Sequence, residues 1–120
     1  MMMTDTMTKQ MRDCIQACMD CYKMCTEMQM KCMDMGCDSA AMKMMMDCAQ
    51  MCQMCADFMM RNSTMSMEMC GMCAKMCTAC AASCESMAKG DMMAMMMDCA
   101  KTCRMCAEMC MAMSKTAMAA

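Results

Sequence analysis

The sequence predicts an all-α fold, an antiparallel up-down four-helix bundle with a cysteine-lined core. Two observations predict it: most of the 18 cysteines recur at alternating steps of three and four residues, and they do so in four separate runs. Such steps keep residues on one face of a helix, as in the heptad seam of a bundle. A β-strand would alternate them between two faces. The 120 residues are enough for one domain, which we expect to span residues 1–120.

Each run of cysteines defines one predicted helix. The runs are Cys14, Cys18, Cys21, Cys25 and, one heptad later, Cys32; then Cys48, Cys52 and Cys55; then Cys70, Cys73, Cys77, Cys80 and Cys84; then Cys99, Cys103, Cys106 and Cys110. The predicted helices cover about residues 5–35, 39–61, 64–88 and 91–114. Gly36 and Gly90 stand where glycine ends a helix, Thr4 or Asp5 is expected to cap the first helix, and Asp38 or Ser39 is a suitable cap for the second. The short connections favour antiparallel neighbours.

The core of this bundle has to be packed with sulfur-containing side chains. The chain has 35 methionines and no leucine, valine, tryptophan or histidine, whereas ordinary cores are built from Leu, Ile, Val and Phe. Methionine is flexible and specifies a packing arrangement poorly. We therefore expect a softly packed protein that stiffens when metal fills its core.

The seam cysteines are predicted to bind metal. Residues three and four apart on a helix have Cβ atoms about 5–6 Å apart, so two thiols can share one ion. A core lined with thiols suits Cu(I), Zn(II) or Cd(II). Copper is favoured because Cu(I) replaces a thiol proton one for one and leaves the buried core neutral, whereas a four-thiolate zinc site carries two excess negative charges. All cysteines except Cys37, in the first connection, are candidate ligands.

Methionines are predicted at both mouths of the cysteine core. One mouth would carry Met7, Met11, Met59 and Met113. The other would carry Met45, Met87, Met92 and Met96, near Cys37. Thioethers are soft ligands for Cu(I), so we expect the second group to accept Cu(I) and pass it to the thiolates inside. Packing is the simpler role for any single methionine.

Three other hypotheses for the role of the cysteines remain open. A Zn(II) or Cd(II) thiolate protein resembling metallothionein would bind about one ion per four cysteines. A metal-free structural or designed bundle would use the cysteines as small apolar residues. A disulfide scaffold is less consistent with cysteines on one face of long helices, and no ferredoxin-type spacing is present.

Other functional classes find little support. An enzyme is not expected, because the chain has no histidine to activate a cysteine. The net charge of −2 and the absence of a basic stripe argue against nucleic acid. Neither a membrane span nor a signal peptide is recognisable, so we expect a cytoplasmic protein with copper ions as its partners.

Four segments resemble the bacterial Cys-rich four-helix-bundle copper storage proteins. They are residues 14–21 (CIQACMDC), 47–52 (DCAQMC), 70–77 (CGMCAKMC) and 98–108 (DCAKTCRMCAE). The resemblance implies a bundle filled with multiple Cu(I) ions held mainly by thiolates, often as a homotetramer, with the seam cysteines as ligands. Family members commonly carry histidine near the open end of the bundle, where this chain has methionine.

Overall fold

The computed structural model describes residues 8–119, with side chains described through residue 115. This part of the chain forms four long helices and no strand: α2 (Lys9–Met35), α3 (Ser39–Met60), α4 (Ser66–Met87) and α5 (Met93–Ala119), with a short 3-10 helix, η1 (Gly90–Met92), before the last. The predicted all-α four-helix fold is confirmed.

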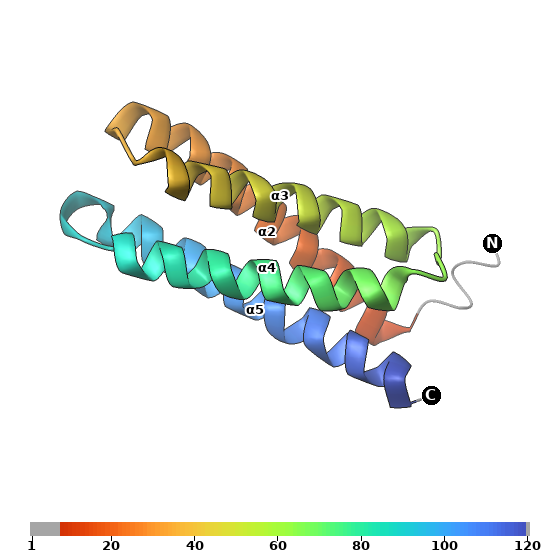
Figure 1. The fold of residues 1–120 in the computed structure, drawn as a ribbon. Coiled ribbons are helices and arrows are strands. Elements are labelled where there is room, and N and C mark those ends of the chain that lie inside the picture. The colour runs from red at the N-terminus through yellow and green to blue at the C-terminus, as the bar shows by residue number, and fades with distance from the viewer. Residues whose placement is uncertain (1–7, 120) are drawn as a thin grey trace.

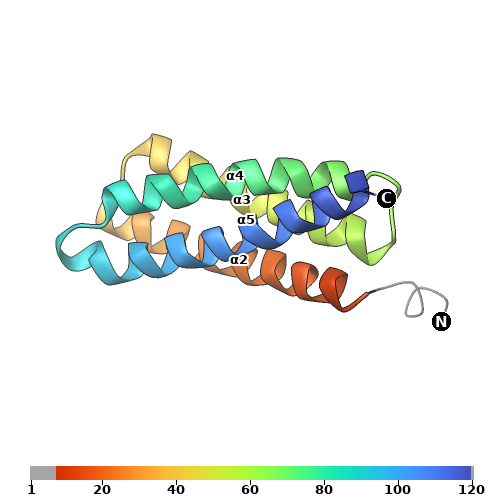
Figure 2. The ribbon, with the colours of Figure 1, turned by 90° about the horizontal axis from the view of Figure 1, so that it is seen from below.

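The helices form a ring in which each one packs against two others. α2 pairs with α3, α3 with α4, α4 with α5, and α5 returns beside α2. The chain reverses at each short connection (Figures 1 and 2). Connections 36–38 and 88–92 lie at one end of the bundle, here called the two-loop end. Connection 61–65 lies at the opposite, one-loop end, together with the start of α2 and the end of α5.

Local capping explains where two of the helices begin. Thr8 caps α2, its hydroxyl accepting a hydrogen bond from the backbone N–H of Met11 at 3.1 Å. The Asp38 carboxylate caps α3 in the same way, accepting from the N–H of Ala41 at 2.8 Å, as predicted. The expected caps of the first helix, Thr4 and Asp5, lie outside the described residues.

The two glycines act differently at the ends of α2 and α4. Gly36 has φ +77° and ends α2 in the left-handed conformation, as the sequence indicated. Gly90 also has a positive φ, but α4 has already ended at Met87, and Gly90 opens η1 instead. This extra turn explains why α5 begins at Met93, two residues after the predicted start.

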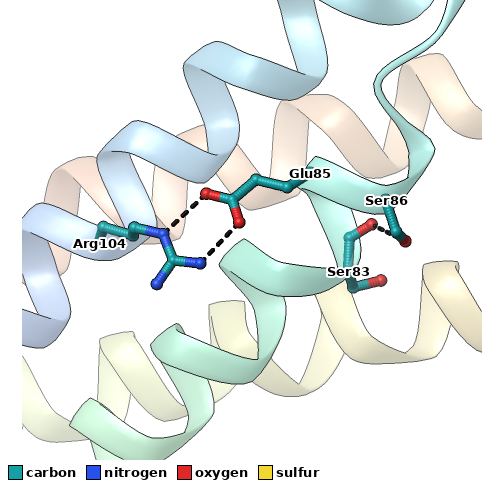
Figure 3. Close-up of polar contacts among 4 residues, drawn as sticks. All are labelled: Ser83, Glu85, Ser86 and Arg104. Atoms are coloured by element: carbon teal, nitrogen blue, oxygen red, sulfur yellow. Dashed lines mark hydrogen bonds and ion pairs between the residues drawn. The ribbon is translucent and has the colours of Figure 1, made fainter.

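The surface of the bundle carries the charges. All 11 lysine and arginine side chains are exposed. Of the two ion pairs among the described residues, one joins different helices: Arg104 on α5 donates from Nε and Nη2 to the carboxylate of Glu85 on α4 at 2.7 and 2.6 Å (Figure 3). In the same picture Ser86 hydrogen-bonds within α4, to the carbonyl oxygen of Ser83. Within residues 8–119, no helix combines the length and apolar character needed to span a membrane.

Candidate metal centre

Every cysteine predicted as a ligand points into the bundle. All of the seam cysteines have an exposed side-chain fraction of 0 %. Alanines that follow the seam, such as Ala56, Ala74 and Ala81, are also buried and small enough to let the helices approach one another. The interior is therefore a closed column of sulfur.

Contacts between sulfurs define how α2 is aligned with α5 and α3 with α4. Between α2 and α5, Sγ–Sγ distances of 3.7 Å join Cys14 to Cys110, Cys18 to Cys106 and Cys21 to Cys103. Between α3 and α4, distances of 3.6, 3.8 and 3.8 Å join Cys55 to Cys70, Cys52 to Cys73 and Cys48 to Cys77. Residue numbers rise on one helix as they fall on its partner, so both pairs are antiparallel.

These contacts arrange the cysteines in layers, each with one residue from every helix. From the one-loop end inward the layers are Cys14, Cys55, Cys70 and Cys110; then Cys18, Cys52, Cys73 and Cys106; then Cys21, Cys48, Cys77 and Cys103. We call these layers the thiol segment. A 3.9 Å contact between Cys21 and Cys48 closes the third layer between α2 and α3.

Methionine enters the layers as the same alignment continues toward the two-loop end. Extending the same spacing along each helix assigns Cys25, Met45, Cys80 and Cys99 to the next level and Met28, Ala41, Cys84 and Met96 to the one beyond. Cys32, Cys37, Met87 and Met92 follow them at the two-loop end. We call Met28, Met45, Met87, Met92 and Met96 the Met-rich end. Met28, Met45 and Met96 are at most 2 % exposed, whereas Met87 and Met92 are half-buried.

The one-loop end is closed by a single layer. Met59, Met113 and Ser66 are buried there, and Met11 is partly buried. The thiol of Cys70 contacts the Met59 sulfur at 3.7 Å, so a thioether lies directly beside the thiol segment. Ser66 donates its hydroxyl to the carbonyl oxygens of Phe58 and Ser63, which fixes connection 61–65 over this end. Met7, predicted at the same mouth, lies outside the described residues.

Four groups of sulfurs are close enough to hold metal ions. In each group all sulfurs lie within 4.8 Å of one another, and the groups are Cys18, Cys73, Cys106 and Cys110; Cys21, Cys52, Cys77 and Cys106; Cys21, Cys25, Cys48 and Cys103; and Cys14, Cys70 and Cys110. Successive groups share Cys110, Cys106 and Cys21. The candidate sites thus form one connected chain along the thiol segment rather than separate sites.

The crowded thiols divide into two classes by the direction of their pKa shifts. Hydrogen bonds from Cys103 and other neighbours lower the pKa of Cys21, and those from Cys110, Cys18 and Cys70 lower the pKa of Cys55 to about 6. The pKa is also lowered for Cys48, Cys73, Cys80, Cys99 and Cys106. It is raised, by hydrogen bonding to neighbouring sulfurs and by burial, for Cys18, Cys25, Cys52, Cys77, Cys84, Cys103 and Cys110.

This division has a simple physical cause. A thiolate that accepts S–H hydrogen bonds is stabilised, and the thiols that donate them hold their protons more tightly. In two of the contacts the pKa is lowered at one sulfur and raised at the other: it is lowered for Cys21 and raised for its neighbour Cys103, and it is lowered for Cys73 beside Cys52, whose pKa is raised. Other contacts join two thiols whose pKa values shift in the same direction, as between Cys52 and Cys77. The core is therefore a network of closely packed thiols whose protons a metal ion can replace.

The structure departs from the sequence-based expectations at two places. Met28, buried at 2 % exposure between Cys25 and Cys32, was not among the methionines predicted at a mouth. Its spacing of three from Cys25 and four from Cys32 is the signal that places it on the seam. Cys32, expected to be a free ligand, is joined by a disulfide to Cys37, leaving 16 free cysteines among the described residues.

The comparisons with known proteins agree with this geometry. The family model described as copper storage protein matches residues 7–115. A solved structure of a protein from Nitrosospira multiformis is 38 % identical, with a TM-score of 0.80, covering 90 % of this chain and 97 % of its own. The Cu(I)-bound copper storage protein BsCsp3 is 31 % identical, with a TM-score of 0.80, covering 88 % and 99 %.

An apo copper storage protein from Bacillus subtilis is also similar. It is 32 % identical, with a TM-score of 0.71, over 86 % of this chain and 97 % of its own. No match was found among the curated proteins. The family match spans most of the chain, and it includes all of the buried cysteines described above. The chain belongs to the copper storage protein family.

Proposed function

We propose that this protein stores copper by holding many Cu(I) ions among the thiolates of its core. The observation that carries the proposal is the sharing of sulfurs between neighbouring groups, through Cys21, Cys106 and Cys110. A sulfur that belongs to two groups can bridge two ions, which Cu(I) thiolate clusters require. Isolated tetrahedral zinc sites would instead need four sulfurs of their own.

The charge of the interior supports copper over zinc. Each Cu(I) that displaces one thiol proton leaves the core neutral, whereas a Zn(II) bound by four thiolates leaves two negative charges buried. All 11 lysine and arginine side chains are exposed, so none of them compensates such charge inside the thiol segment. A buried network of sulfur without cations is therefore best neutralised by Cu(I).

The predicted ligands follow from the same geometry. The groups around Cys18, Cys21, Cys106 and Cys110 would take up Cu(I) in the thiol segment. Cys25, Cys80, Cys84 and Cys99 would extend binding toward the two-loop end, because they occupy the next levels of the buried column. Met45, Met87, Met92 and Met96 would assist loading there, since Met87 and Met92 are half-buried and can meet a Cu(I) donor before the thiols do.

The proposed role is storage and buffering rather than catalysis. Family membership supports storage, and the carboxylates of the described residues are exposed or half-exposed, away from the sulfur column. Sixteen free thiols persist best in a reducing compartment, which supports a cytoplasmic location. Assembly as a homotetramer belongs to the same proposal and rests on the family resemblance.

An anaerobic titration of the fully reduced apo protein tests the proposal. Cu(I) would be added in the presence of a chromophoric Cu(I) chelator, and the number of ions taken up before the chelator responds would be counted. We expect uptake close to one ion per buried thiol. Saturation near one Zn(II) per four thiols, with weak Cu(I) uptake, would instead support the zinc-binding alternative, and no uptake of either ion would support a purely structural bundle.

A further inference from the structure

We propose that Cys32 and Cys37 form a redox-controlled Cu(I) site at the two-loop end of the bundle. When oxidised, the pair is a disulfide that withholds two sulfurs from the core. When reduced, it supplies two thiolates at the last level of the sulfur column. The inference rests on the proposed copper storage and adds to it a site whose availability depends on the thiol–disulfide state of the surroundings.

The backbone brings the two cysteines together independently of the bond between them. Gly36, in the left-handed conformation, turns the chain back at the end of α2. The N–H groups of Gly36 and Cys37 both donate to the carbonyl oxygen of Cys32, at 2.9 and 3.0 Å. The Cα atoms of Cys32 and Cys37 are consequently 5.0 Å apart, within the range that permits a disulfide. A reduced pair held by this turn keeps both sulfurs close together for binding Cu(I).

This pair differs from every other cysteine of the described chain. The remaining cysteines are free and lie on the four long helices, where most of their sulfur contacts join different helices. Cys37 alone lies in a connection, where it is half-buried and packs against the core. Cys32 is fully buried on the seam. One sulfur of the pair can therefore be reached by an external thiol, while the other belongs to the column that holds copper.

A buried thioether lies beside the position, and further methionines lie at the same end of the bundle. Met28 lies one turn before Cys32 on the same face of α2 and is 2 % exposed. Met87 and Met92 are half-buried at the same end of the bundle, next to its other connection. Two thiolates close to neutral thioethers match the preference of Cu(I) for soft sulfur ligands. The lysine beside the pair, Lys31, is exposed and is no soft ligand.

The redox step is an ordinary thiol–disulfide exchange. An external dithiol attacks one sulfur of the pair as a thiolate, and the Cys32–Cys37 bond breaks through a mixed disulfide. The dithiol loses two electrons and becomes a disulfide, and both cysteines become thiols. Each thiol then releases one proton when Cu(I) binds. Oxidation by a disulfide of the same chemical class reverses the first step and removes the two ligands.

A single proteolytic fragment reports the state of this pair. Trypsin cleaves after Lys31 and Lys43, and the fragment 32–43 contains Cys32, Cys37 and no other cysteine. The protein would be equilibrated anaerobically with glutathione buffers of increasing oxidation, denatured, alkylated and digested. We expect the fragment to change from doubly alkylated to disulfide-bonded over the series, while the fragments from the thiol segment remain alkylated.

Copper capacity tests whether the reduced pair is a site. Cu(I) titrations would compare the reduced protein, the protein oxidised at this pair alone, and the C32S/C37S variant. We expect the reduced protein to bind about two ions more than either of the others, because each thiolate accommodates about one Cu(I). The matched control is Cys84→Ser, which should lower capacity but leave the redox behaviour of fragment 32–43 unchanged.

Three results would overturn the inference. They are a pair that never oxidises before the core thiols, a disulfide that no dithiol reduces in the folded protein, and equal Cu(I) capacity in the reduced protein and the C32S/C37S variant. Each of these leaves copper storage standing if the reduced protein still fills its core. Failure of the wild-type protein to bind Cu(I) at all would instead refute the proposed function itself. Helix content measured by circular dichroism establishes that the variant is folded.

Discussion

The thiol segment and the Met-rich end occupy equivalent positions of the same four helices, yet only one is built to bind charge. Both contain fully buried residues on the heptad seams, with Cys21 and Cys106 at 0 % exposure and Met28 and Met96 at 2 % and 0 %. In the thiol segment, sulfurs contact one another at 3.5–4.0 Å and carry protons that a cation can replace. At the Met-rich end the sulfurs are thioethers, which have no proton to lose. Burial therefore shows where the core lies. The residue type, cysteine or methionine, decides which part of the core stores metal.

Copper loading should produce the largest effect and should act mainly on the thiol segment. A ligand that binds only the folded state at about a thousand times its dissociation constant adds roughly 4 kcal/mol of stability. We expect a rise in Tm of about 10 °C or more on loading. Hydrogen exchange should slow most in helical turns around Cys18, Cys52, Cys73 and Cys103. Identical melting of the apo and loaded proteins would contradict a softly packed core that metal stiffens.

Truncating a methionine at the Met-rich end should destabilise the apo protein strongly. Met96 is 0 % exposed, and removal of a buried side chain of this size costs about 2–5 kcal/mol. Urea denaturation of reduced Met96→Ala should show this loss. The matched control is Met30→Ala, at a residue that is 61 % exposed, where the change should stay within about 0.5 kcal/mol. Equal effects of the two variants would mean that the Met-rich end is not a packed core.

The sequence was sufficient to predict the thiol segment, because the regular period of a helix decides which residues share one face. Steps of three and four place Cys70, Cys73 and Cys77 on one face of a helix, and the structure buries all three. The packing of the four faces then follows, because each must be covered by another. The number of helices and their approximate ranges can therefore be predicted from the spacing of nearby residues.

The methionines and the first connection were harder to predict for physical reasons. Methionine occupies 35 positions, both inside and outside, so its presence does not mark a face. Met28 could be recognised only by its spacing from cysteines. The pairing of Cys32 with Cys37 depends on the direction in which Gly36 turns the chain, and the seam pattern contains no information about a residue in a connection.

Removing a shared sulfur should reduce copper capacity more than removing an unshared one. Cys21 belongs to two of the groups in the thiol segment, whereas Cys84 belongs to none of the groups found among the described residues. We expect Cys21→Ser to lose about two Cu(I) ions and Cys84→Ser about one, since a serine hydroxyl is a poor ligand for Cu(I). The anaerobic chelator titration measures both. Equal losses would indicate independent sites instead of bridged clusters.

Replacing thioethers should change the rate of loading and not its extent. Met92 is half-buried at the two-loop end, and Met96 is buried one turn further inside. The M92L/M96L variant keeps a similar side-chain volume, a change that usually costs less than about 1.5 kcal/mol. We expect the variant to load Cu(I) severalfold more slowly in stopped-flow measurements, with the same final number of ions. An unchanged rate would leave Met92 and Met96 as packing residues only.

The smallest expected effect concerns the ion pair that joins α4 to α5 outside the sulfur column. Arg104 lowers the pKa of Glu85 through its hydrogen bonds, so the pair stabilises the fold above the ordinary pKa of glutamate and loses this contribution as pH falls through the lowered value. Both groups are solvent-exposed, and such pairs contribute little. We expect Glu85→Gln to lower Tm by no more than about 3 °C at pH 7, and by less near pH 3.

A matched control separates the contact between helices from a general loss of surface charge. Asp13 pairs with Lys9 at 2.7 Å within α2 alone, so Asp13→Asn removes an ion pair without touching the packing of two helices. If only Glu85→Gln alters hydrogen exchange near Cys84 and Cys99, the ion pair helps to hold α4 against α5 where the thiol groups are no longer connected. If both variants have the same effect on hydrogen exchange, the buried sulfurs set the alignment of these helices. The surface ion pair then does not contribute to it.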